Sequence, residues 1–505
     1  MRNVSKTLFL NGLVCPTSGW LMRSGKVTKS ISEVTLGERF RIEQGIEIHR
    51  RAREVYPDGF LIDEMGLESA SRKTKNLMND PSVSTIFEGA FLVDGFVARA
   101  DILRRKGKGW HLSEVKSSVN DKKEFIDDMA YTVMVINRCG LDVSKVSLLL
   151  ISKGFRLGMP NEKLFLEIDH TEEVLVRVEE FKPFWEKIEE ITRTPVKPES
   201  QLVFECRKCG LFKKCLGKGI SNHIFQIPRL SQSKFNKLTE SGIVCIENIP
   251  DGFPLTENQA RVRVCVQTKK AFVGNRLKSE LESISWPLYY LDFETVAAAI
   301  PLYPDIAPYT QIPTQYSIHK CSKPGHVIDH LEYLADPSKD CRRELVENLI
   351  NDLKGEGNII VYGSFEKTLI TNLGRVYTDF SRELDSLIGR MIDLLAIIRK
   401  NYYHPDFHGS TSIKNTLPVL VPDMSYDKLE IADGDSAMAA FAYLALGKYE
   451  DRELETVKRN LLEYCKQDTL AMIKLHERLI EYIHDHTADN RAHPAPLTSS
   501  VRKTS

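Results

Sequence analysis

The 505-residue chain lacks several features that would assign it to a broad class. Its 69 basic and 69 acidic residues cancel, so no net charge draws the molecule towards nucleic acid or membrane. Any nucleic-acid binding would therefore have to come from local basic patches. No apolar run is long enough to span a bilayer. The first residues hold only a short, Gly-interrupted apolar segment, which we interpret as mature sequence and not as a signal peptide.

Cysteine is also scarce. Ten cysteines in a chain of this length, without a signal peptide, do not indicate a disulfide scaffold. We therefore expect a reduced, cytoplasmic setting, in which clustered cysteines indicate metal. No internal repeat is visible. What is present is 42% hydrophobic residues in a chain several times longer than a typical domain, which predicts two or three domains with substantial cores.

Periodicity divides the chain into four segments. Residues 1–217 mix helix and strand patterns, with three consecutive strands in "TIFEGAFLVDGFVARADILRRKGKGWHLSEVKSS". Residues 218–285 are predicted to form a helical connector. Its stretch "LSQSKFNKLTESGIVCIENIP" indicates two short helices around a Gly-containing turn, a hairpin that is usually a plain connector but can contact a phosphate backbone. Residues 286–485 return to an α/β pattern, and residues 486–505 are predicted to be a disordered tail.

The stretch "WPLYYLDFETVAAAIP" is unusual because a buried strand carries two acids at its far end. Residues two apart on a strand share a face, so Asp292 and Glu294 point the same way and would repel each other. A divalent metal removes that problem, and hard oxygen ligands suit Mg²⁺ or Mn²⁺. For an isolated D-x-E pair, two ordinary acids at a solvated strand end would be the simpler interpretation.

Further acids accompany this pair. "NIIVYGSFEKTLI" places Glu366 where another strand opens into a helix, and "LLEYCKQDTLAMIKLHERL" places Tyr464 and Asp468 four apart on one helical face. The set resembles the DnaQ-like 3′→5′ exonucleases of the RNase H-like fold. The resemblance implies two metal ions held by four carboxylates: Asp292, Glu294, Glu366 and Asp468. It also implies that Tyr464 positions the attacking water. That family usually has Asp at the position of Glu366, and Asp393 in "MIDLLAII" is a rival ligand.

A second constellation lies in the N-terminal half. "ARADILRR" ends a strand with Asp101, and the next strand, "WHLSEVKSS", places Glu114 and Lys116 two apart on one face. This arrangement resembles the PD-(D/E)XK nucleases of the restriction-endonuclease-like fold. The resemblance implies that Asp101 and Glu114 hold a divalent cation and that Lys116 orients the attacking water or helps to deprotonate it. Alone, E-x-K occurs by chance in most proteins, and a surface ion pair is the simpler interpretation.

The helix before these strands supports the resemblance. "QGIEIHRRA" matches the G-x-x-x-H helix of the RecB-type branch, which implies that His49 is a further metal ligand. Glu88, on the strand before Asp101, also fits the RecB-like pattern, or else it only pairs with a basic residue. RecB-type nucleases usually carry a Gln and a Tyr on the following helix. Here "DDMAYTVMV" supplies Tyr131 but no Gln, a departure that concerns substrate positioning more than metal binding.

The cysteines indicate a further centre. "FECRKCGLFKKCLGKG" contains a C-x2-C-x5-C triplet, and "LVCPTSGW" supplies a fourth cysteine far away in the sequence. An early cysteine and a late triplet that bracket a RecB-like nuclease resemble the iron–sulfur nucleases, such as the AddB subunit. The resemblance implies a [4Fe–4S] cluster on four thiolates: Cys15, Cys206, Cys209 and Cys215. Tetrahedral Zn²⁺ on the same thiolates is the main rival, and plain buried cysteines without metal are the third interpretation.

Nearly the full length resembles an uncharacterised bacterial family that joins an iron–sulfur RecB-like nuclease to a DnaQ-like domain. "VSKTLFLNGLVCP", "YLDFET" and "PYTQIPTQYSIH" are further points of likeness. The resemblance implies a metal-dependent nuclease with two active sites, acting on DNA rather than RNA, in repair, recombination or defence. The alternatives are one live nuclease beside a nucleic-acid-binding or structural module, an RNA-directed nuclease, and a binding protein whose acids are structural.

Overall fold

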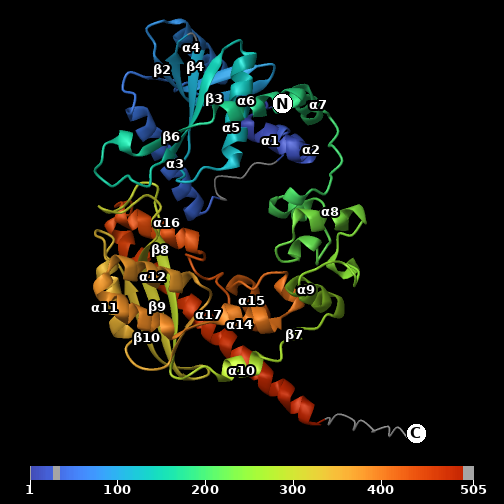
Figure 1. Cartoon of the computed structure of the whole chain (residues 1–505), viewed down its shortest axis with the longest axis vertical. Coiled ribbons are helices and arrows are strands. Elements are labelled where there is room, and N and C mark those ends of the chain that lie inside the picture. Colours follow the sequence, from blue (N-terminus) through green and yellow to red (C-terminus); the bar gives the residue numbers. More distant parts are fainter. Residues whose placement is uncertain (1, 27–33, 108, 493–505) are drawn as a thin grey trace, which may run out of the picture. The chain divides into compact units, whose positions relative to one another are not determined.

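The computed structural model describes residues 2–26, 34–107 and 109–492, with side chains up to residue 484. The chain has a mixed α/β architecture and forms two compact units (Figure 1). Unit 1 comprises Met1–Gly219 together with two later segments, Val296–Gln311 and Met438–Leu446. Unit 2 comprises Ile220–Thr295, Ile312–Ala437 and the chain from Gly447 onward. Each unit carries one of the two predicted acidic constellations.

Unit 1 is built on a mixed six-stranded sheet with the order β1-β2-β3-β4-β5-β6. Its strands are β1 (Phe60–Leu61), β2 (Thr85–Val93), β3 (Phe96–Lys106), β4 (Gly109–Val115), β5 (Val143–Ile151) and β6 (Phe165–Asp169). β2, β3 and β4 are antiparallel neighbours, whereas β4 and β5 run parallel. The three consecutive strands predicted from the sequence are therefore confirmed.

Helices cover this sheet. They are α1 (Lys6–Val14), α2 (Pro16–Arg23), α3 (Leu36–Glu54), α4 (Leu67–Asn79), α5 (Lys123–Arg138), α6 (Thr171–Phe181) and α7 (Trp185–Arg193). α5 packs across β2, β3 and β5, and its apolar residues are buried in the core of the unit. α3 begins with a capping box, in which Thr35 and Glu38 satisfy each other's backbone N–H groups. These contacts stabilise α3 and α5. The two helices carry residues that were predicted to lie beside the acids of β3 and β4.

The connector is the first part of unit 2. It contains α8 (Gln232–Glu240), α9 (Glu257–Thr268), β7 (Phe272–Val273) and α10 (Leu277–Glu282). The first of the two predicted short helices is α8, and Gly242 follows it with φ of 70°, which suits a turn. The second is a single 3₁₀ turn, Ile246–Asn248. The predicted hairpin is therefore shorter than the sequence pattern indicated.

The rest of unit 2 surrounds a five-stranded mixed sheet with the order β10-β9-β8-β11-β12. Its strands are β8 (Leu288–Val296), β9 (Ile312–Lys323), β10 (His326–Leu334), β11 (Asn358–Val361) and β12 (Met391–Asp393). β8, β11 and β12 run parallel, and β9 and β10 form an antiparallel hairpin. Parallel strands end at the same edge of a sheet, so the residues at the ends of β8 and β11 share one edge.

The helices of this region begin between the strands of the sheet and continue after the last of them. They are α11 (Arg342–Asp352), α12 (Phe365–Val376), α13 (Ser381–Gly389), α14 (Leu394–Asn401), α15 (Ile413–Leu420) and α17 (Asp451–Ala492), with β13 (Tyr402–Tyr403) after α14. α16 (Gly434–Ala445) begins in unit 2, and its residues from Met438 belong to unit 1. α17 packs on β9 and β10 (Figure 1, red). Residues 486–492 of the predicted disordered tail form the last part of α17. No Gly or Pro interrupts the sequence before Pro494, and a helix propagates where nothing breaks it. Residues 493–505 lie outside the described residues.

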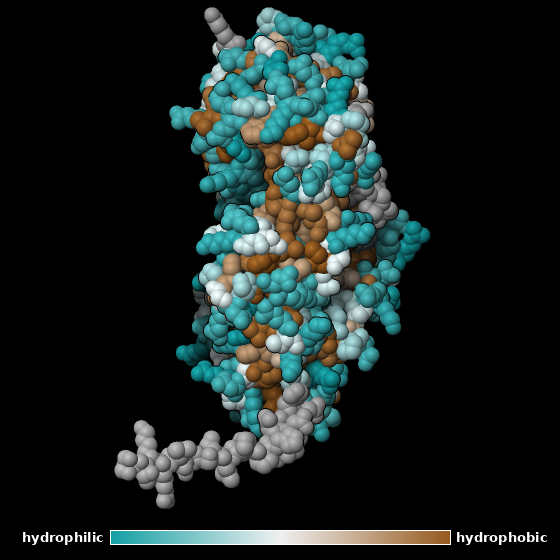
Figure 2. Space-filling model, turned by 90° about the vertical axis from the view of Figure 1, so that its right-hand side faces the viewer, coloured by the Kyte–Doolittle hydropathy of each residue, from teal (hydrophilic) through white to brown (hydrophobic). Residues whose placement is uncertain are grey.

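The surface mixes polar and apolar side chains. Figure 2 shows one face, on which hydrophilic residues (teal) cover much of the area and hydrophobic residues (brown) form patches between them. Large exposed hydrophobic residues such as Ile46, Met65 and Val196 come from different elements of unit 1, and such single exposures are ordinary in folded proteins. None of the described helices is long and apolar enough to cross a membrane.

Candidate functional site

Three carboxylates converge in unit 2. Ligand oxygens of Asp292, Glu294 and Asp468 all lie within 4.8 Å of one another. Asp292 and Glu294 share a face of β8 because they are two residues apart on a strand. Asp468 comes from α17, which lies far from β8 along the chain. The structure thus brings together three of the four carboxylates that were predicted as ligands here, and we call these three the unit 2 cluster.

The unit 2 cluster is electrostatically strained. Burial raises the pKa of Asp292 and of Glu294 well above their usual values, and the nearby Asp468 raises both further. Burial also raises the pKa of Asp468 to about 6, although hydrogen bonds from Tyr426 and Tyr464 act in the opposite direction. Like charges in a poorly hydrated place disfavour ionisation, and a divalent cation would reverse that effect. The unit 2 cluster therefore offers oxygen ligands and poorly compensated negative charge, the two properties that a site for a hard metal ion needs.

Glu366, the fourth predicted ligand, lies beside the unit 2 cluster and not within it. It is buried in the first turn of α12, and its Oε2 atom has no hydrogen-bond partner in the described part of the chain. Burial raises its pKa to about 7, with smaller effects of Asp393 and Asp468. The rival Asp393 accepts a hydrogen bond of 3.0 Å from the backbone N–H of Ala396 and so caps α14. Glu366 keeps an unengaged oxygen near the cluster, whereas Asp393 has a structural hydrogen bond.

Sequence reasoning missed two side chains around the unit 2 cluster. The hydroxyl of Tyr426 donates a short hydrogen bond to Oδ1 of Asp468. Lys414 opposes the effect of burial and lowers the pKa of Glu294 and of Asp468. Lys414 lies in the first turn of α15 and Tyr426 in the loop that follows this helix, and no motif spacing marks either residue. Tyr464, which was predicted, is buried and hydrogen-bonded to Asp468.

A second set of ligand atoms converges in unit 1. His49 of α3, Glu88 of β2 and Asp101 of β3 offer ligand atoms within 4.8 Å of one another. The Nδ1 atom of His49 lies 3.6 Å from Oε1 of Glu88 and 4.0 Å from Oδ1 of Asp101. Glu88 has a φ of 55°, in the left-handed region that non-glycine residues rarely adopt. Backbone strain of this kind persists only where the surrounding structure holds the residue in place, and it is common at functional sites. We call these three residues and Glu114 the unit 1 cluster.

Glu114 differs from the other acids because two lysines neutralise it. Its Oε1 atom accepts hydrogen bonds from Nζ of Lys6 at 2.7 Å and from Nζ of Lys116 at 3.0 Å. Lys116 also donates a short hydrogen bond to Asp128 of α5. Burial opposes ionisation, yet the two lysines lower the pKa of Glu114 to about 2. The Oε2 atom of Glu114 is buried and has no hydrogen-bond partner among the described residues, so one oxygen remains for a ligand.

Asp101 lies next to Glu114 and has the opposite electrostatics. Burial and the charge of Glu114 raise the pKa of Asp101 to about 7. Its Oδ2 atom accepts a hydrogen bond of 2.8 Å from the backbone N–H of Val115, which ties β3 to the strand that carries Glu114. The predicted pair of Asp101 and Glu114 is therefore together, with His49 and Glu88 beside it. Lys6 and Asp128 have no sequence signal that could have marked them.

Tyr131 has a structural role. It is fully buried on α5, and its hydroxyl donates hydrogen bonds to the backbone oxygens of Val4 at 2.6 Å and Val97 at 3.0 Å. It therefore ties the N-terminal residues to β3. A hydroxyl engaged in this way supports the fold and not a substrate.

The four cysteines predicted as cluster ligands lie near one another in unit 1. Burial raises the pKa of the Cys206 thiol, and the thiols of Cys15, Cys209 and Cys215 raise it further, which places all three close to it. Cys15 stands between α1 and α2, and the triplet lies around two 3₁₀ turns that follow α7. Two distant stretches of sequence thus bring their thiols to one place.

The spacing of these thiols bears on which metal they fit. Among the described residues, two sets of side chains bring three ligand atoms within 4.8 Å of one another, and the cysteines belong to neither. Four thiolates around a single zinc ion would hold their sulfurs about 3.8 Å apart, as Zn–S bonds of about 2.3 Å require. The described structure brings no three of the four thiols that close to one another, so it shows their proximity but does not select between zinc and a larger cluster.

Comparison with known proteins adds a family match. A model described as a domain of unknown function (DUF2779) matches residues 289–412. The matched stretch begins on β8 and contains Asp292, Glu294 and Glu366, but it ends before α17. It therefore covers part of the unit 2 cluster and leaves Asp468 outside.

Two bacterial proteins are similar to this chain. One is "Uncharacterized protein MG366 homolog" of Mycoplasma pneumoniae, 24% identical over 232 residues, which are 42% of this chain and 35% of that protein. The other is "Uncharacterized protein MG366" of Mycoplasma genitalium, 23% identical over 236 residues, which are 41% of this chain and 34% of that protein. The chain thus spans about a third of the length of the curated relatives it matches.

Proposed function

We propose that the chain is a metal-dependent nuclease with two phosphodiesterase sites. Unit 2 would be an RNase H-like exonuclease of the DnaQ type, and unit 1 a restriction-endonuclease-like PD-(D/E)XK nuclease of the RecB type. The observation that carries the proposal is the convergence of Asp292 and Glu294 on β8 with Asp468 on α17. Bringing buried like charges together costs free energy. A bound cation would offset this cost and would act on a phosphodiester beside it.

In unit 2, Asp292, Glu294 and Asp468 would hold Mg²⁺ or Mn²⁺, and Glu366 would add its unengaged oxygen. Bound ions of this kind activate water and stabilise the charge that develops on the leaving oxygen. Tyr464 holds the Asp468 carboxylate through a hydrogen bond and would also orient the attacking water. The product expected of this site is a nucleic acid shortened from its 3′ end.

In unit 1, His49, Glu88, Asp101 and the Oε2 atom of Glu114 would hold the divalent ion. Burial would lower the pKa of Lys116, but Glu114 and Asp128 together raise it above the usual lysine value. Lys116 therefore keeps its proton, and its charge can orient water and attract the scissile phosphate. Of the two predicted roles for Lys116, this charge state favours orientation over proton removal.

The four thiols would hold a [4Fe–4S] cluster, as the resemblance to the iron–sulfur nucleases implies, with Zn²⁺ as the main rival. Binding would join Cys15 to the triplet and remove the chain entropy of a very long loop. Protein purified without oxygen should be brown and contain iron and acid-labile sulfide. Stoichiometric zinc without iron would show instead that the thiols serve a zinc site.

The proposed activity is tested with the purified full chain and end-labelled single- and double-stranded DNA and RNA. We expect cleavage that requires Mn²⁺ or Mg²⁺ and stops with EDTA, with stepwise loss of 3′ nucleotides from single-stranded DNA. If no substrate is cut under any metal condition, the chain is a binding protein whose acids are structural.

A second candidate function has its own supporting observation. Lys6 occupies Oε1 of Glu114, which leaves the unit 1 cluster neutralised in part by the protein itself. Unit 1 would then bind nucleic acid while unit 2 cuts it. Cleavage by a variant whose unit 2 cluster is disabled separates the two candidates.

A further inference from the structure

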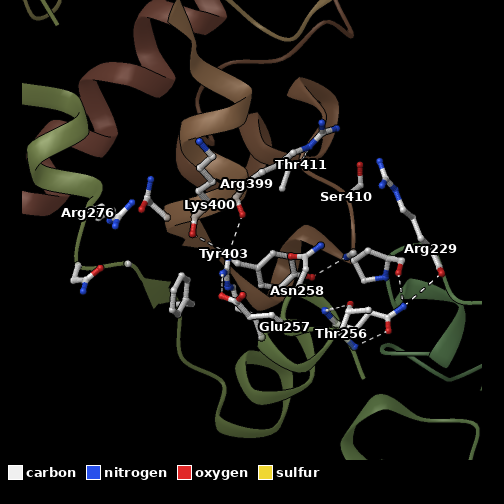
Figure 3. Close-up of a pocket in the computed structure, with 18 of the residues that line it drawn as sticks. Arg229, Thr256, Glu257, Asn258, Arg276, Arg399, Lys400, Tyr403, Ser410 and Thr411 are labelled. Atoms are coloured by element: carbon white, nitrogen blue, oxygen red, sulfur yellow. Dashed lines mark hydrogen bonds and ion pairs between the residues drawn. The ribbon is translucent and has the colours of Figure 1, made fainter. Parts of the chain in front are cut away.

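Unit 2 contains a large cavity that shares no residue with the unit 2 cluster. Its volume is about 980 Å³. Figure 3 shows the side chains that line it. One wall comes from the connector, through residues around α8, α9 and β7, and the other comes from the end of α14 and the segment that follows it. We call it the basic cavity.

The charge of the lining is strongly one-sided. Six cationic residues line the basic cavity: Arg229, Lys234, Arg261, Arg276, Arg399 and Lys400. The carboxylates there are Glu257 and Glu280. Glu257 lies 3.3 Å from Arg261, and Glu280 accepts a hydrogen bond of 3.0 Å from Asn401. Both acids are thus engaged within the lining, and an excess of positive charge remains.

Three of the cations have no partner among the residues that the structure describes. Within the described ranges, no hydrogen bond or ion pair engages the side chains of Arg229, Arg276 and Lys400, and all three are exposed. The side chain of Arg399 donates a hydrogen bond of 3.2 Å to the hydroxyl of Thr411, and no carboxylate of the described chain forms an ion pair with it. Neighbouring cations without counter-charges repel one another, so an anion in the basic cavity would relieve that repulsion.

The walls of the basic cavity are held by close backbone contacts. Gly409 has a φ of 81°, and a Cβ atom there would lie 1.7 Å from the backbone oxygen of Gln226. At the other end, the backbone N–H of Gly274 donates to the oxygen of Asn401 at 2.7 Å, and a Cβ atom on Gly274 would lie 3.0 Å from the Cα of Asn401. β7 and β13 complete this junction as an antiparallel pair. The two walls are therefore fixed against each other within the unit.

We propose that the basic cavity binds successive phosphate groups of a single nucleic-acid strand. Figure 3 shows Arg276 and Arg229 on opposite sides of the view, with Lys400 and Arg399 between them. A row of cations matches the repeating charge of a strand better than one compact anion. The choice of nucleic acid over another polyphosphate rests on the proposed function. The site would hold the strand at a distance from the residues that cut it.

The proposal is tested by binding, without cleavage. Fluorescence anisotropy of a labelled single-stranded oligonucleotide is measured with the full chain in EDTA over a range of salt concentrations. The test variant is Arg276→Ala with Lys400→Ala. The matched control is Arg382→Ala with Lys448→Ala, which removes two exposed cations of unit 2 that lie outside the cavity. Circular dichroism and the thermal midpoint confirm that each variant is folded.

We expect the cavity variant to bind about tenfold more weakly and to reduce the slope of log K against log salt by about 1.4, for two lost contacts to a single strand. Equal losses in the control variant, or unchanged binding by the cavity variant, would overturn the proposal. Inorganic triphosphate and a nucleoside triphosphate form a second arm. If either binds through Arg276 and Lys400 while the oligonucleotide does not, the cavity is a site for a small polyphosphate.

This experiment stands apart from the nuclease assay. Binding that depends on the cavity without any metal-dependent cleavage would remove the proposed function and leave the binding site. Metal-dependent cleavage without binding at the cavity would remove the proposed binding site and leave the proposed function.

Discussion

The two acidic clusters solve the same electrostatic problem in different ways. In unit 1, Lys6 and Lys116 neutralise Glu114 from within the protein and lower its pKa to about 2. In unit 2, burial and the nearby acids raise the pKa of Asp292 and Glu294, and Lys414 offsets only part of this effect at Glu294. Unit 1 therefore carries part of its own counter-charge, whereas the buried acids of unit 2 are left largely uncompensated by the described residues. The same type of substitution should have opposite effects in the two clusters.

The largest expected effect is on catalysis. Asp292→Asn should reduce the removal of 3′ nucleotides about 1,000-fold, the loss expected when one strong electrostatic contact to the reacting groups is removed. Cleavage by unit 1 should persist in this variant and disappear in Lys116→Ala. The measurement is product length on end-labelled DNA with Mn²⁺.

Asp385→Asn and Lys163→Ala, exposed residues of units 2 and 1, serve as charge-matched controls. If Asp292→Asn removes all cleavage and Lys116→Ala removes none, only unit 2 is a nuclease, and the comparison between two active sites fails.

The next effect concerns the stability of unit 1 without metal. Glu114→Gln should lower the free energy of unfolding by about 3 kcal/mol. The two lysines would lose the buried carboxylate whose pKa they hold well below its normal value. Hydrogen exchange of the β3–β4 peptides in EDTA measures this locally. Exchange as slow as in the wild type would show that the Lys6 and Lys116 contacts add nothing to stability.

A pH effect of similar size is expected in unit 2. His476 on α17 is buried, its Nδ1 atom makes a 2.8 Å hydrogen bond with Tyr290, and burial lowers its pKa to about 4. The unfolded chain takes up this proton near pH 6.5 but the folded chain does not, so stability falls as the pH drops from about 6.5 to 4. Relative to His476→Gln, the wild type should lose about 3 kcal/mol over this range. Denaturant unfolding at several pH values measures the difference, and a constant difference would contradict the prediction.

The smallest effect has the opposite sign to that of Glu114→Gln. In EDTA, Asp292→Asn should stabilise unit 2 by about 1–2 kcal/mol, because an amide keeps the shape of the side chain and removes a buried, repelled charge. With Mn²⁺ present the sign should reverse, since the variant loses a ligand. Hydrogen exchange of β8 and α17 peptides reports both conditions. A loss of stability in EDTA would mean that the unit 2 cluster is not strained without metal.

Local patterns predicted much of what surrounds the clusters. The alternation along β8 placed Asp292 and Glu294 on one face, and the order of strands in unit 1 placed Asp101 beside Glu114. These predictions depend on neighbours in sequence or on adjacent strands, so a period of two residues is enough to make them. α17 continues to Ala492, within the segment for which the composition predicts a disordered tail.

Other features required the folded chain. Lys6, Asp128, Lys414 and Tyr426 are ordinary residues in sequence, and only tertiary packing places them against the carboxylates. The basic cavity is similar: its cations are spread over the connector and the end of α14, and two glycines allow the close backbone approach that gathers them. No periodic pattern encodes such contacts, because they join residues far apart along the chain.

The sequence by itself determined which chemical groups are available and on which strand or helix face each one lies, because side-chain direction follows from local backbone geometry. Only the tertiary structure decided which carboxylates are neutralised by lysines and which remain largely uncompensated among the described residues, because charge interactions depend on distance and burial in three dimensions.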